Sequence, residues 1–127
     1  MLLLLSSFPM SRGGGGVSAV QVAKLGAECL FFTALGDDVS GRSTAARLED
    51  EGVTVLAAVR KGAQTRAVSA VGATGDRGIV VIGDPTSARI EDLLPWDDLA
   101  ACDAAYFTGH DSATVAEDSA IDIAVRG

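Results

Sequence analysis

The sequence is poor in the residue types from which many functional sites are built. It holds one histidine, two cysteines, one tryptophan and one tyrosine in 127 residues, and aromatic residues make up 5% of it. Cys29 and Cys102 both have apolar neighbours and no partner ligands at zinc-site spacing, so we expect no metal site and two buried, reduced thiols. With so few aromatics, the core is expected to consist of Ala, Val, Leu and Ile, which suits a tightly layered α/β fold.

Basic residues and long hydrophobic runs are scarce as well. Ten Lys and Arg stand against 17 Asp and Glu, which gives a net charge of -7, and the basic residues form no patch in the sequence. A nucleic-acid partner is therefore not expected. The apolar start, MLLLLSSFPM, has only four leucines and no preceding basic residue, which is too short for a transmembrane helix and poor as a signal peptide. We expect no membrane partner and a cytoplasmic location.

Periodic segments of the first half predict half of a βαβ unit. A short helix is expected over 17–25, followed by an apolar strand that includes Cys29-Leu30-Phe31-Phe32. The segment GDDVSG is typical of a turn, and Asp37, Asp38 and Ser40 within it can each cap a helix. The following segment, RSTAARLEDEG, predicts an amphipathic helix that ends at Gly52. Strand, turn and helix in this order indicate an α/β fold with a parallel sheet.

The pattern then changes to three β-like runs without helices between them. VTVLAAV, TRAVSAVGA and GIVVIG predict a small antiparallel sheet over about residues 53–83, with a hairpin turn at Gly75-Asp76. After it, IEDLLPWDDLAAC predicts a helix interrupted at Pro95. DAAYFTG predicts a strand and the last 16 residues another helix.

The glycine run Gly13–Gly16 lies directly before the first predicted helix. A flexible linker is a poor interpretation, since only a dozen residues precede the run. A dinucleotide-binding loop is a competing interpretation, because Asp37 and Asp38 follow at about the expected distance, but SSFPMSR makes a poor preceding strand. The third interpretation is a loop whose bare backbone N–H groups face a polar ligand at a helix start.

The order of motifs is more specific than any single motif. A glycine run, a helix ending in AKLGAE, an apolar strand, ALGDDVSG, a helix ending in LEDEGV, then QT and GDRGIVV follow one another. This order resembles the N-terminal part of the PfkB (ribokinase-like) carbohydrate kinases, from about Gly13 to about Gly109. The resemblance implies a Rossmann-like three-layer α/β sheet with a small antiparallel β lid, and ATP and Mg²⁺ as cofactors of the full-length family.

The resemblance also implies a set of sugar-binding residues. They are Gly13, Gly14, Gly15, Gly16, Ser18, Asp38, Thr65 and His110. The glycines approach sugar hydroxyls by their backbone, and Ser18 stands where the family usually has Asn, with a shorter side chain. Each has a plainer alternative: Asp38 as a helix cap, Thr65 as a β-former, His110 as an ordinary polar residue at a strand end.

The phosphate-handling part of the family pattern is missing from the sequence. Family members carry a GAGD segment toward the C-terminus, which holds the transferring phosphate and supplies the base, and no such segment occurs here. We therefore expect a truncated chain, a partial kinase domain over 1–127 without the ATP-binding half. No catalytic residue is expected within it, and no tight cofactor binding. The alternative is a non-catalytic sugar-binding or dimerisation module, with a homodimer formed through the lid strands.

Overall fold

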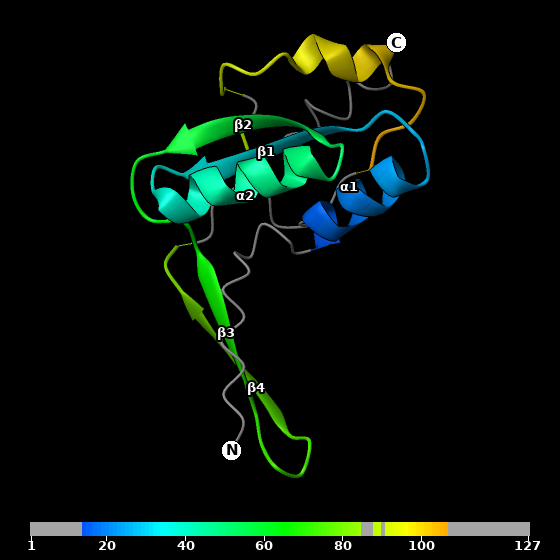
Figure 1. The fold of residues 1–127 in the computed structure, drawn as a ribbon. Coiled ribbons are helices and arrows are strands. Elements are labelled where there is room, and N and C mark those ends of the chain that lie inside the picture. The colour runs from blue at the N-terminus through cyan, green and yellow to red at the C-terminus, as the bar shows by residue number, and fades with distance from the viewer. Residues whose placement is uncertain (1–13, 85–87, 90, 107–127) are drawn as a thin grey trace.

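The computed structural model describes residues 14–84, 88–89 and 91–106 of the 127-residue chain. The elements, in chain order, are α1 (Gly14–Lys24), β1 (Leu30–Gly36), α2 (Val39–Asp50), β2 (Thr54–Arg60), β3 (Arg66–Val71), β4 (Arg77–Ile82) and the 3₁₀ helix η2 (Trp96–Ala101). Figure 1 shows a layered body from which β3 and β4 project. The positions of Gly13 and His110, and the predicted C-terminal helix, lie outside the described residues.

The parallel sheet forms as predicted, with β1 and α2 close to their expected bounds. β1 and β2 pair in parallel, in a register that joins Leu30 to Thr54 and Gly36 to Arg60. Paired residues of parallel strands point to the same side of the sheet. Phe32 and Arg60 therefore lie on one face, and Phe31 lies on the other face together with residues 55, 57 and 59 of β2. These two faces carry different parts of the chain.

Both α-helices cover the face that contains Phe31. The core cluster consists of Ala19 and Val20 from α1, Leu48 from α2 and Val53, and Phe31 packs against it. Leu48 is fully buried. The core is therefore built from small and aliphatic side chains, as the scarcity of aromatics predicted. Within the described residues, no helix has the length and apolar character to cross a membrane.

Local signals explain the bounds of α2. The Asp38 side chain accepts a hydrogen bond from the N–H of Gly41, which caps the helix start. The helix is followed by Gly52 with φ +89°, a conformation that favours glycine. The end of the helix agrees with the sequence prediction, whereas its start lies three residues before the predicted Arg42, directly after one of the three candidate capping residues.

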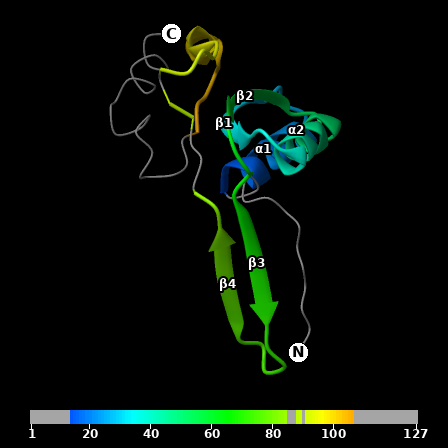
Figure 2. The ribbon, with the colours of Figure 1, turned by 90° about the vertical axis from the view of Figure 1, so that its left-hand side faces the viewer.

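The antiparallel sheet differs from the prediction by one strand. β2 (Thr54–Arg60) pairs with β1 in the parallel sheet, so it does not belong to the lid. The lid is the two-stranded hairpin of β3 and β4, which we call the lid hairpin. Its turn contains Gly75 with φ +87°, and Gly72 N–H donates to the Asp76 carbonyl at 2.7 Å, which confirms the predicted turn. Figure 2 shows the lid hairpin extending well away from the body.

The second face of the parallel sheet faces residues 88–89 and 91–102. The predicted helix in this segment is a single 3₁₀ helix, η2, which begins after Pro95. Residues 104–106 have no regular structure, so the predicted strand is absent from that part of its range. The Phe32 and Trp96 rings stack with centroids 5.1 Å apart, which places η2 against β1 and completes a three-layer arrangement.

Candidate functional site

The parallel sheet, helix α2 and the lid hairpin meet at the end of β1. Gly36 N–H donates to Gln64 Oε1 at 2.6 Å, and Gln64 is 3% exposed. A Cβ at Gly36 would lie 2.4 Å from Gln64 N, and a Cβ at Gly41 would lie 2.0 Å from Gly36 O. Only glycine fits at these two positions, so backbone packs directly on backbone. We call residues 62–66 with 83–84 the lid base.

Asp38 connects α2 to the lid base. Its Oδ1 accepts from Gly41 N–H at 2.8 Å, and its Oδ2 lies 3.1 Å from Arg66 Nη2. The N–H of Gly41 lowers the pKa of the Asp38 carboxyl from its usual value, with smaller contributions from Gln64 N–H and the Arg66 guanidinium, and partial burial opposes them. The carboxylate is therefore ionised at neutral pH, and both of its oxygens have protein partners.

Thr65 ties the start of the lid hairpin to its end. The side chain is buried, and its hydroxyl donates to the Asp84 carbonyl. This bond joins the residue before β3 to the residue two positions after β4. The hydroxyl oxygen keeps lone pairs that can accept from a ligand. Thr65 therefore serves the closure of the hairpin in this structure.

The turn that carries Asp38 is also fixed by main-chain bonds. Asp37 N–H is shared between the carbonyls of Arg60, at 2.8 Å, and Gly62, at 2.9 Å. The end of β2 therefore holds the turn that follows β1. Beside it, on the α2 side, lies a hollow of about 260 Å³. Its lining consists of the aliphatic side chains of Leu35, Ala45, Ala57 and Val59, together with Gly36, Asp37, Gly41 and Arg42. Its aliphatic lining offers few partners for the hydroxyl groups of a polyol.

The glycine run begins a helix instead of forming a loop. Gly14, Gly15 and Gly16 form the first turn of α1, three residues before the predicted helix start. Glycine in a helix costs roughly 0.5–1 kcal/mol relative to alanine, so packing against the sheet must offset this cost. The first N–H groups of a helix have no acceptor within it, and glycine adds no side chain over them. Of these residues Gly15 is half-buried and Gly16 is buried. The start of α1 lies on the side of the body from which the lid hairpin extends (Figures 1 and 2).

The predicted site residues thus form two groups within the described chain. Asp38 and Thr65 come together through Gln64 and Arg66 at the lid base, and Gly14–Gly16 and the half-buried Ser18 lie on α1. Gln64 was not predicted as a site residue. A polar residue directly before a predicted strand was the available signal, but its burial depends on contacts with residues 28 positions away.

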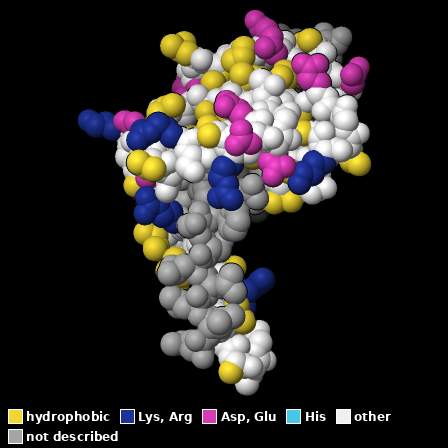
Figure 3. Space-filling view, viewed as in Figure 1, with side chains coloured by type: hydrophobic (Ala, Val, Ile, Leu, Met, Phe, Trp, Pro, Cys, Tyr) yellow, Lys and Arg dark blue, Asp and Glu magenta, His cyan; other side chains and the backbone are white. Residues whose placement is uncertain are grey.

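The charged and metal-binding side chains of the body follow a simple distribution. Acidic side chains spread over the upper body in Figure 3, and Lys and Arg gather near the level where the lid hairpin leaves it. Within residues 14–84, 88–89 and 91–106, no group of three or more His, Cys, Asp and Glu could hold a metal ion. Both cysteines are free thiols, as predicted. Each is half-buried, whereas full burial was predicted.

Comparison with known proteins agrees with the arrangement of these elements. The model of the pfkB family of carbohydrate kinases matches residues 2–124. The structure is similar to that of a fructokinase from Xylella fastidiosa, with 29% sequence identity and a TM-score of 0.54 over 62% of this chain. The chain spans about a quarter of that fructokinase, 26% of its length. A search of curated proteins found no match.

Proposed function

Because the chain belongs to the pfkB family of carbohydrate kinases, we propose that it is the sugar-holding part of an ATP-dependent sugar kinase. In such an enzyme the γ-phosphoryl group of ATP passes to a hydroxyl of the sugar. We further propose that this chain alone does not catalyse the transfer. The observation that carries the proposal is the family match over nearly the whole chain, together with the absence of a GAGD segment from the sequence.

The proposed sugar contacts are the N–H groups of Gly14–Gly16 at the start of α1, with Ser18 on the same helix. Backbone N–H groups at a helix start suit neutral hydroxyl groups, because they donate hydrogen bonds without needing a counter-charge. At the lid base, Thr65 can accept from a hydroxyl, and Asp38 holds the lid base in place through Arg66. Gly13 and His110 remain proposed contacts on the family resemblance alone.

The described residues do not fit the binding of ATP and Mg²⁺. Phosphoryl transfer needs groups that bind the phosphates, neutralise their charge and accept the hydroxyl proton. The described acidic residues form no metal-binding group, and the two oxygens of Asp38 are engaged by Gly41 and Arg66. No step of the reaction is therefore assigned to a residue of this chain.

Sugar binding and turnover can be tested separately. Fructose is the first sugar to test, since the similar solved structure is a fructokinase. Calorimetric titration of the chain with fructose is expected to show weak binding, and a coupled assay for ADP with ATP and Mg²⁺ is expected to show no turnover above buffer. Turnover would refute the proposed lack of catalysis. Absence of binding by fructose, ribose and a wider sugar panel would refute the sugar-holding role.

A second candidate function is a dimerisation module, and one observation favours it. Ile79, Val80, Val81 and Ile82 of β4 are 49–61% exposed, in a run of four apolar residues. Exposed apolar strands commonly pair with another chain. Light scattering of the chain should then show a dimer, and Val80→Lys should convert it to a monomer, whereas the matched change of the exposed helix residue Val22→Lys should not. A monomeric wild-type chain would refute this candidate.

A further inference from the structure

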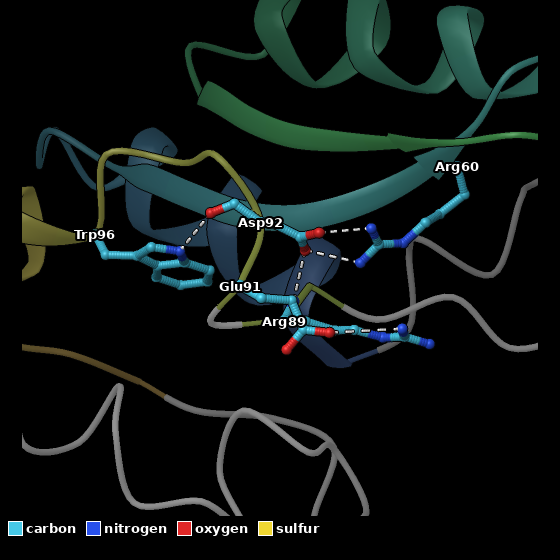
Figure 4. A network of polar contacts seen from close by, with 5 residues as sticks. All are labelled: Arg60, Arg89, Glu91, Asp92 and Trp96. Carbon is cyan, nitrogen blue, oxygen red and sulfur yellow. Dashed lines mark hydrogen bonds and ion pairs between the residues drawn. The ribbon is translucent and has the colours of Figure 1, made fainter.

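Residues 88–89 and 91–102 surround one carboxylate on the second face of the sheet. The Asp92 side chain is 9% exposed. Its oxygens accept from the two terminal nitrogens of Arg60, at 2.5 and 2.7 Å, and from Arg89 N–H at 2.7 Å. The Asp92 carbonyl accepts from Trp96 Nε1 at 3.0 Å (Figure 4). A bidentate pair of this kind fixes the orientation of both side chains.

The segment is attached to the sheet at two points. Arg60 is the last residue of β2, and the Trp96 ring stacks on Phe32 of β1 with an interplanar angle of 17°. The two contacts lie on the same face, because Phe32 pairs with Leu56 and Arg60 lies four residues after Leu56 on β2. Glu91, by contrast, lies beside Asp92 and pairs only loosely with Arg89, at 3.8 Å on the surface.

Arg60 also acts through its main chain. Its carbonyl accepts from Asp37 N–H at 2.8 Å, and the same N–H also reaches the Gly62 carbonyl at 2.9 Å, two residues further on. Asp37 precedes Asp38, which caps α2 and pairs with the lid hairpin. Directly after Arg60 the chain enters a turn with the exposed Gly62 at φ +121°. A strand end that leads into an exposed turn is prone to fraying, and a side-chain anchor limits such movement. The side chain of Arg60 is anchored by its ion pair with Asp92.

We propose that Arg60 is a positioning residue that couples the docking of residues 88–102 to the position of the Asp37–Asp38 turn. The Arg60 side chain is held by Asp92 only when the segment is docked, and the Arg60 carbonyl accepts a hydrogen bond from the Asp37–Asp38 turn. The consequence for sugar binding rests on the proposed function, since Asp38 of that turn pairs with Arg66 of the lid base. The coupling itself is independent of any ligand.

The test compares Asp92→Asn with Glu91→Gln, which removes the neighbouring carboxylate as a matched control. Trp96 is the only tryptophan of the chain, so its fluorescence reports docking directly. Amide hydrogen exchange of Asp37 reports the turn, and that of Val53, bonded to the Leu48 carbonyl in the core, reports global stability. Asp92→Asn is expected to shift the Trp96 emission to the red and to speed Asp37 exchange by about tenfold, with Val53 unchanged. Glu91→Gln should change neither.

Each other result overturns the proposal or isolates a different failure. Trp96 undocking with unchanged Asp37 exchange, or no undocking at all, would overturn the coupling. Should Val53 exchange also rise in Asp92→Asn, the milder Arg60→Lys decides, because one ammonium keeps the charge but cannot bind both oxygens. It should speed Asp37 exchange by a smaller factor, and no change would refute the proposal. If the wild-type chain binds fructose, Asp92→Asn should weaken that binding while Glu91→Gln does not. If it binds no sugar, the proposed function fails and the exchange data still decide the coupling.

Discussion

Replacing Gly41 by alanine tests the backbone contact on which the candidate site is built. A Cβ at this position would stand 2.0 Å from Gly36 O and 2.9 Å from Gly36 C, where ordinary contact begins at 3.4 Å. Both atoms are backbone, so no side chain can rotate away. The start of α2 and the end of β1 must therefore separate by roughly 1 Å, which also lengthens the bond between Asp38 and residue 41.

The expected cost follows from two opposing terms. Overpacking of this kind costs about 1–3 kcal/mol, and rigid backbone places Gly41 at the upper end. Alanine regains up to about 1 kcal/mol of helix propensity. We expect a net loss of about 2 kcal/mol in the free energy of unfolding, which is a large share of the stability of a small domain.

The matched control is Gly78→Ala in β4, where an added Cβ meets nothing within 4 Å. It loses the same backbone freedom in the unfolded chain, so its stability should change by no more than about 1 kcal/mol. Urea unfolding followed by far-ultraviolet circular dichroism measures both variants. If Gly41→Ala proves as stable as Gly78→Ala, α2 does not press on the end of β1 and the account of the lid base is wrong.

Three further predictions concern single side chains. Gln64→Leu leaves the buried Gly36 N–H without its acceptor and should lower the free energy of unfolding by about 1–3 kcal/mol. Gln21→Leu, on the exposed side of α1, should change the free energy of unfolding little. Equal effects of the two substitutions in urea unfolding would contradict the structure. Hydrogen bonds from Arg60 lower the pKa of the Asp92 carboxyl, and the Arg89 N–H adds to this effect. The ionised carboxylate therefore stabilises the docked segment above the unfolded pKa of about 3.9. This stabilisation is lost as the pH falls through the lower pKa that Asp92 has in the folded chain. Trp96 emission should therefore stay constant from pH 7 to about 4 and shift only below it, and a transition near pH 6 would refute this assignment. Burial, with a smaller contribution from Cys102, raises the pKa of the Cys29 thiol. Iodoacetamide should therefore label Cys29 more slowly in the folded chain than in urea at about pH 7.5. Equal labelling rates, measured by peptide mass spectrometry, would contradict this prediction.

The parts of the fold that depend on neighbouring residues could be predicted from the sequence. Asp38 and Gly52 delimit α2, and Gly75 marks the hairpin turn, because caps and turns are set within a few residues. The partner of β2 could not be read in this way, since a strand of seven residues looks the same in a parallel sheet and in a lid. The sequence shows a break in the β pattern at residues 61–64, and the lid hairpin starts after it. The sequence does not reveal whether the lid begins before or after this break.

The candidate site was predicted in outline but not in its contacts. Asp38 and Thr65 were singled out, yet their actual partners, Gly41, Arg66 and Asp84, include residues 28 and 19 positions away. The glycine run was interpreted as a loop because it lies directly before the first predicted helix. In the structure Gly14–Gly16 belong to that helix, and packing of Ala19 and Val20 in the core offsets the low helix propensity of glycine. Arg60 and Asp92 are 32 positions apart, and no local pattern joins them.

The proposed function requires that this chain binds a sugar at the start of α1 and that its own residues do not bind the triphosphate. Nuclear magnetic resonance of the ¹⁵N-labelled chain tests it directly, with fructose in one titration and ATP with Mg²⁺ in another. The account predicts that fructose shifts the amide signals of Gly14, Gly15 and Gly16 and that ATP leaves them unchanged. ATP shifting those signals in place of fructose would contradict it.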